Sequence, residues 1–141
     1  MRTIDIIIIH CSATRADRDY PLEALRRDHL ERGFTDVGYH FYIRKDGRLA
    51  DGRPVALAGA HALGWNAHSI GICYEGGLDA HGLPADTRTE AQRHAMRVLI
   101  RVLRLAYPTI AHVMGHRDTG APKACPCFDV ATDPWCNDPH A

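Results

Sequence analysis

The chain has 141 residues, of which 45% are hydrophobic and 24% are charged, a composition typical of one ordinary globular domain. This balance excludes an intrinsically disordered chain, and the longest apolar run, IDIIIIH, is too short to cross a bilayer. Because 17 basic residues balance 17 acidic ones, no overall charge favours a nucleic acid or a membrane surface as partner.

The first two predicted elements are a strand and a helix. Residues 4–9 read as a buried strand, because β-branched residues follow one another without polar alternation. Residues 21–32 form a short amphipathic helix in which Pro21 suits the first turn and Gly33 is placed to end it. The strand therefore ends directly before His10.

The middle of the chain reads mainly as strands. Residues 39–43 and 49–50 flank the Asp-Gly pair at 46–47, a strong two-residue turn signal, and so form a hairpin. Two further strands are predicted over 54–61 and 69–75, separated by a glycine-containing loop.

A long helix and a last strand complete the pattern. The helix is expected to begin at a capping box of Thr87 and Glu90 and to end before Pro108, and a solvated surface is the favoured interpretation of its row of arginines. A short strand over 110–114 then precedes His116. Since strands and helices interleave, we expect an α/β fold in a single domain over 1–141, with a central mixed β-sheet flanked by α-helices.

Three side chains that bind metals follow the predicted strands. His10 leaves the first strand, and His116 leaves the last one just before a loop that carries Cys125. Sites in α/β proteins are assembled at strand ends, so these donors are expected to converge. Two imidazoles and a thiolate suit zinc and leave its fourth tetrahedral position open, as in catalytic sites. A core histidine beside a buried thiol, or a Cys125 nucleophile activated by His116, are the alternatives.

A lysine lies beside these donors. A zinc ion with an open position lowers the pKa of water to about 7 and polarises carbonyl groups, which is chemistry suited to amide hydrolysis. Lys123, one of just two lysines in the chain, lies two residues before Cys125 and can face the oxyanion that develops on the attacked carbonyl.

Several stretches together resemble one family. They are IHCSAT (9–14), VGYHFYIRKDG (37–47), GAHALGWNAHSIGICYEGG (59–77), and GHRD with APKACPCFD (115–129). In this order they are similar to the zinc amidases related to peptidoglycan-recognition proteins, and within these to the short phage endolysins that cleave N-acetylmuramoyl-L-alanine bonds. The resemblance runs from about Ile6 to Asp129.

The resemblance implies a reaction and the residues that perform it. His10, His116 and Cys125 match the ligands of one zinc ion, and Tyr39 and Lys123 match the active-site tyrosine and lysine. The implied reaction is hydrolysis of the amide between N-acetylmuramic acid and L-alanine, with a cell wall-lysing role in a phage or prophage. In it, Tyr39 orients the attacking water or relays its proton.

Other residues in the matching stretches are expected to serve the substrate. His61 lines the groove as a substrate contact or as a donor behind a ligand, and Trp65 and Asn66 contact glycan or peptide, with loop packing as the alternative for both. Cys127 departs from the family, which more often has a small residue there. It is expected either to compete for the metal or to form a labile disulfide.

Two related functions remain as alternatives. A cytosolic amidase that recycles anhydromuropeptides shares the fold but tends to have an aspartate as its third ligand, and a non-catalytic peptidoglycan-binding module usually lacks the metal cysteine. The expected partner is bacterial peptidoglycan, with no nucleic acid or membrane partner, and the expected state is a monomer. Because no signal peptide is visible, we expect synthesis in the cytoplasm and action on the wall after release.

Overall fold

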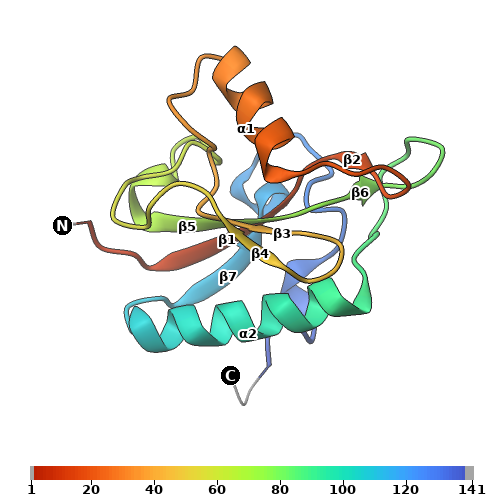
Figure 1. Ribbon diagram of the computed structural model, residues 1–141. Helices are drawn as coiled ribbons and strands as arrows, with labels where there is room; N and C mark the ends of the chain where they lie inside the picture. Colours follow the sequence, from red (N-terminus) through yellow and green to blue (C-terminus); the bar gives the residue numbers. More distant parts are fainter. Residues whose placement is uncertain (1, 139–141) are drawn as a thin grey trace.

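The computed structural model describes residues 2–138, and these are built around a five-stranded sheet (Figure 1). The strand order is β4-β3-β5-β1-β7, in which all neighbours are parallel except the antiparallel pair β3 and β4. The strands are β1 (Ile6–Cys11), β3 (Phe41–Ile43), β4 (Leu49–Asp51), β5 (Ser69–Tyr74) and β7 (His112–Gly115). The predicted α/β class with a mixed sheet is confirmed.

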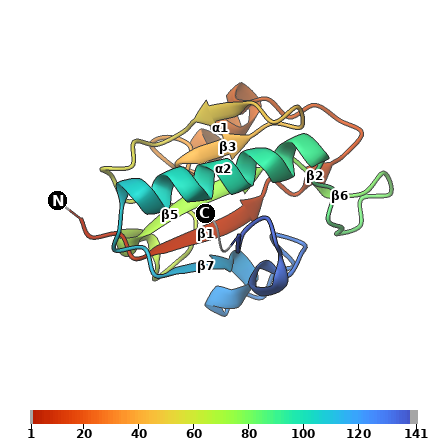
Figure 2. The same cartoon turned by 90° about the horizontal axis from the view of Figure 1, so that it is seen from below.

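Two α-helices lie on opposite faces of this sheet (Figures 1 and 2). The helix α1 (Leu22–Glu31) covers one face, and the longer α2 (Glu90–Ala106) runs across the other. A second, small sheet pairs β2 (Thr14–Arg15) with β6 (Gly77–Leu78). Three 3₁₀ turns complete the described elements: η1 (Asn66–His68), η2 (His116–Thr119) and η3 (Val130–Thr132).

Successive residues of β1 and β5 face different helices, although both strands are buried throughout. On the α2 face, the largest apolar cluster contains Ile7, Ile9, Ile70, Ile72, Met96, Leu99, Ile100 and Leu103. On the α1 face, Ile6 and Ile8 pack with Ala62. His10 follows Ile8 in the same alternation, so β1 places its imidazole on the α1 face of the sheet.

The helix α1 is one residue shorter at each end than the predicted 21–32. Pro21 lies at its N-cap, and Gly33 follows the C-cap with φ +92°, a left-handed conformation that glycine adopts without strain. The turn between β3 and β4 is longer than the predicted two residues, because Arg44 N–H donates to Arg48 O and leaves three residues between them.

The predicted strand over 54–61 is absent from the structure. Leu57 N–H instead donates to Pro54 O in a turn, and Leu57 is 56% exposed. The segment crosses from the edge strand β4 to the central strand β5, and Ala60 N–H finds its acceptor in Gly38 O, outside any strand. Its N–H groups are therefore bonded within a turn and to the segment before β3, and not in a sheet ladder.

The start of α2 also differs from the prediction. Its capping box is formed by Thr89 and Gln92, whereas Thr87 Oγ1 accepts the N–H of Gly77. The Gln92 amide also donates to Ile43 O and Glu75 O, which ties the first turn of α2 to the sheet. These tertiary bonds favour the later start, and the sequence pattern does not reveal them.

Candidate active site

The two histidines predicted to bind metal are brought together by neighbouring strands. His10 lies near the end of β1 and is 1% exposed, and Ile9 pairs with Gly115 at the end of β7. His116 follows at once, so that the two imidazole centroids are 4.6 Å apart. The Asp118 carboxylate accepts the Gly115 N–H and thereby holds the turn that carries His116.

Cys125 reaches the same place from the loop after η2. Arg117 N–H donates to Cys125 O at 2.9 Å, and Cys11 N–H donates to Cys125 Sγ at 3.3 Å. The thiol sulfur lies 4.0 Å from His10 Nδ1. The ligand atoms of His10, His116 and Cys125 all lie within 4.8 Å of one another, so one ion can be shared among them. Two imidazoles and a thiolate fit zinc in number and in softness.

Electrostatics keep both imidazoles in the neutral form that a metal requires. Burial lowers the pKa of His10 well below its ordinary value, and His61, His116 and Lys123 lower it further. Burial also lowers the pKa of His116, with a second contribution from Lys123. Neither ring must lose a proton at neutral pH before it can act as a ligand.

Tyr39 and Lys123 flank the donors. Tyr39 lies just before β3, with its ring centroid 4.9 Å from that of His10. Burial raises the pKa of Tyr39 well above its ordinary value, and the nearby thiols, Cys73 first among them, raise it further. The phenol therefore remains a hydrogen-bond donor. Lys123 is exposed and lies on the wall of two adjoining pockets.

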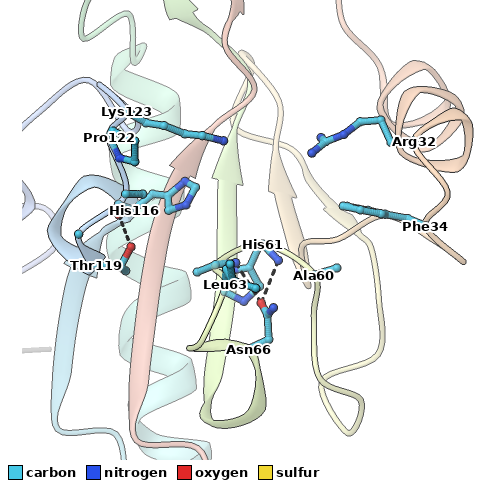
Figure 3. Close-up of a pocket in the computed structure, with 13 residues that line it drawn as sticks. Arg32, Phe34, Ala60, His61, Leu63, Asn66, His116, Thr119, Pro122 and Lys123 are labelled. Carbon is cyan, nitrogen blue, oxygen red and sulfur yellow. Dashed lines mark hydrogen bonds between the residues drawn. The ribbon is translucent and has the colours of Figure 1, made fainter.

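The two pockets form one groove that passes over the donors. Their volumes are about 580 and 340 Å³. Both are lined by Arg32, Ala60, His61, His116 and Lys123, which makes them continuous. Figure 3 shows Lys123 and Arg32 extending toward the groove from opposite sides.

The residues expected to contact substrate lie in three different settings. His61 lines both pockets but is 8% exposed, and burial lowers its pKa to about 3. Asn66 lines the larger pocket, while its Oδ1 accepts the N–H groups of His61 and Ala62. Trp65 is not among the described residues that line either pocket, and it packs against the cluster of Ile6, Ile8 and Ala62.

The sequence did not point to Arg32 and Phe34, which form one wall of the larger pocket. The Arg32 guanidinium lies 4.9 Å from the centroid of the Phe34 ring. The only signal in the sequence is Gly33, which predicts the end of α1 but not the direction in which its neighbours point. That direction depends on how α1 packs on the sheet.

Cys127 lies beside the site but outside the group of three donors. Its sulfur is 3.9 Å from that of Cys11, and burial raises its pKa to about 12. The three donors therefore converge without it.

Comparison with known proteins agrees with this geometry. A family described as N-acetylmuramoyl-L-alanine amidase matches residues 1–128. The endolysin of Klebsiella phage KP32 is 47% identical over 124 residues, which cover 88% of this chain and 81% of that protein. The solved structure of the N-acetylmuramoyl-L-alanine amidase LysC from Clostridium intestinale superposes with a TM-score of 0.77 at 31% identity, covering 91% of this chain and 79% of that one.

A further solved structure, Drosophila PGRP-LB, superposes with a TM-score of 0.74 at 27% identity, covering 89% of this chain and 76% of that one. The family match extends over nearly the whole sheet, the groove and all three donors. The chain therefore belongs to the N-acetylmuramoyl-L-alanine amidase family.

Proposed function

We propose that this chain is a zinc-dependent endolysin, which lyses bacterial cell walls by hydrolysing the amide between the lactyl group of N-acetylmuramic acid and L-alanine in peptidoglycan. Membership of the amidase family supports the reaction, and the relatives named as phage endolysins support the lytic role. The observation that carries the proposal is the convergence of His10, His116 and Cys125, of which His116 and Cys125 line the groove.

In this proposal His10, His116 and Cys125 hold one zinc ion. A zinc ion bound there would supply a Lewis acid that acidifies water and polarises the scissile carbonyl. The Cys11 N–H donates to Cys125 Sγ and so helps to hold the sulfur of this ligand in place. The neutral imidazoles add no positive charge to the site.

Lys123 and Tyr39 act on the substrate and on water. The ammonium of Lys123 reaches into the groove beside His116, where it stabilises the negative charge that develops on the carbonyl oxygen. Tyr39, which stays protonated, orients the attacking water through its hydroxyl group or relays the proton to the leaving amine.

The groove holds the glycan and the stem peptide on either side of the donors. His61 and Asn66 lie on its wall, and we retain both as substrate contacts. The role of Trp65 in glycan binding stays a prediction, because that residue lies outside the lining of both pockets.

We further propose that residues 1–141 act as a single catalytic domain and as a monomer, without a nucleic acid or a membrane as partner. Within residues 2–138 no helix is both long enough and apolar enough to span a membrane. Synthesis in the cytoplasm followed by release to the wall fits the endolysins among its relatives.

The test is to count new alanine amino termini after purified peptidoglycan is digested. Wild type should release them, lose the activity with a chelator and regain it with zinc. Cys125→Ala should be inactive with or without zinc, whereas the matched variant Cys127→Ala should remain active. Activity that survives chelation but is lost on alkylation would instead identify Cys125 as a nucleophile. Absence of alanine release from zinc-loaded wild type would overturn the endolysin proposal.

A further inference from the structure

His61 forms a direct hydrogen bond with one of the three donors. His10 Nε2 and His61 Nδ1 are 2.8 Å apart, and His61 Nε2 is 3.2 Å from Ser69 Oγ. All three residues are buried, with Ser69 fully enclosed in β5. The contact between the two rings is edge-on, with an interplanar angle of 87°.

The direction of this chain of hydrogen bonds follows from the position of His10. Its Nδ1 faces the Cys125 sulfur, so Nδ1 is the nitrogen through which His10 would bind the metal. In a neutral ring, Nε2 then carries the proton and donates it to His61 Nδ1. His61 Nε2 carries the proton of the second ring and donates to Ser69 Oγ. Every ring nitrogen in the chain then has one suitable partner.

The protein holds the His61 ring in place from several sides. A Cβ added at Gly71 would lie 2.8 Å from ring carbons of His61, and one added at Gly59 would lie 2.6 Å from the ring. The backbone N–H of His61 donates to Asn66 Oδ1, as a dashed line in Figure 3 shows. Only glycines at these two positions leave room for the ring, so the loop and β5 are built around it.

The geometry points to His61 as a positioning residue: by accepting the His10 Nε2 proton, it fixes the tautomer and the orientation in which His10 presents Nδ1 to the metal. This inference rests on the proposed zinc site. Partners of this kind behind a ligand histidine raise its basicity and hold its ring, and their loss typically weakens metal binding by about 10–100-fold.

His40 provides a matched control, because it is a buried histidine in the same region whose bonds go to backbone groups and to the Arg2 side chain, and not to one of the three donors. Its Nδ1 accepts the Gly71 N–H and its Nε2 donates to Leu57 O. Its ring centroid is 5.9 Å from that of His61. Replacing His40 disturbs the same packing without removing an acceptor from His10.

The test compares His61→Phe, which keeps a ring but removes the acceptor, with His61→Asn, whose Oδ1 takes the place of Nδ1. Zinc affinity is measured by competition with a chromophoric chelator, and the His10 tautomer is read from nitrogen NMR of the ring in the zinc-free protein. We expect about 10–100-fold weaker zinc binding and a mixed His10 tautomer in His61→Phe. We expect His61→Asn to restore most of both, and His40→Phe to change neither.

Wild-type zinc affinity together with a single His10 tautomer in His61→Phe would overturn the inference. Equal losses in His61→Phe and His61→Asn would also overturn it, because a lost packing contact would then explain the effect. If His61→Phe does not fold, Ser69→Ala replaces it, with a smaller loss of affinity expected in the same direction. Failure of the wild type to bind zinc would overturn the proposed function, while the tautomer of the zinc-free protein would still decide the role of His61.

Discussion

The two faces of the central sheet are made by the same strands but serve different purposes. On the α2 face, β1 and β5 present isoleucines to Met96, Leu99, Ile100 and Leu103 of α2 in a continuous apolar core. On the α1 face, the same two strands present His10, Ser69, Gly71 and Cys73, and a groove remains open beside α1. Alternation along a buried strand thus separates folding stability from chemistry within one short segment.

Ile100→Ala tests the stabilising face and should have the largest effect on folding. Ile100 belongs to α2, faces the apolar core and is 2% exposed. Its truncation should reduce the free energy of unfolding by about 2–5 kcal/mol. Alanine release per folded molecule should stay at the wild-type level below the melting transition. Urea unfolding and the digestion assay check the two parts. A loss of specific activity larger than the loss of folded protein would contradict the separation of the two faces.

Lys123→Ala tests the other face. Removal of a group that stabilises an oxyanion should reduce the turnover rate by about 100- to 1,000-fold. Because Lys123 is exposed, the urea midpoint should hardly move. Lys45→Ala is the matched control, since the Lys45 ammonium donates to Arg18 O, away from the groove. Equal activities of the two variants would remove Lys123 from the mechanism.

The α1 face should also make the zinc-free protein sensitive to acid. Burial lowers the pKa of His40 to about 4 from an ordinary 6.5. Between these values the unfolded chain binds a proton that the folded chain does not, so stability falls as the pH drops from 6.5 to 4 and is constant above 6.5. The expected loss from His40 is on the order of 3 kcal/mol in urea unfolding.

The same window contains contributions from His10 and His61, whose pKa values burial also lowers. His40→Asn, whose Oδ1 can still accept the Gly71 N–H, should therefore reduce the dependence on pH without abolishing it. An identical slope in this variant and in wild type would show that His40 is not a source of the acid sensitivity.

Cys127→Ser should have the smallest effect of these changes. The residue packs against the apolar cluster of the α2 face, with its sulfur near Cys11 and outside the group of donors. One zinc ion per chain and activity within about twofold of wild type are expected, because Cys127 is not one of the three donors and serine is close to cysteine in size. A lower zinc content, measured by elemental analysis, would show that Cys127 contributes to the metal site after all.

Local signals predicted the elements whose limits are set locally. The isoleucine run gave β1, and Pro21 with Gly33 gave α1, because these residues act through their own backbone preferences. The strand over 54–61 was predicted wrongly, because an apolar segment with suitable residues still needs a free neighbouring strand. The start of α2 was misplaced for a similar reason, as Gln92 bonds to the sheet.

For the candidate site, the sequence predicted what strand order alone determines. His10 lies inside β1, which runs on to Cys11 and not only to the predicted Ile9, and His116 directly follows β7. The convergence of donors followed from the pairing of these two strands. The bond from His10 to His61 and the wall formed by Arg32 could not be predicted. Both depend on how a loop and a helix settle on one face of the sheet, and no periodic pattern records that packing.

The position of the donors along the chain has a consequence during translation. His10 and Cys125 are separated by 115 residues, and β1 needs β7 beside it to complete the sheet. A ribosome-bound chain that has not yet emerged past Cys125 lacks a ligand, and a prematurely terminated product lacks it permanently. The proposed metal site can thus form only after Cys125 has been made and β7 has paired with β1.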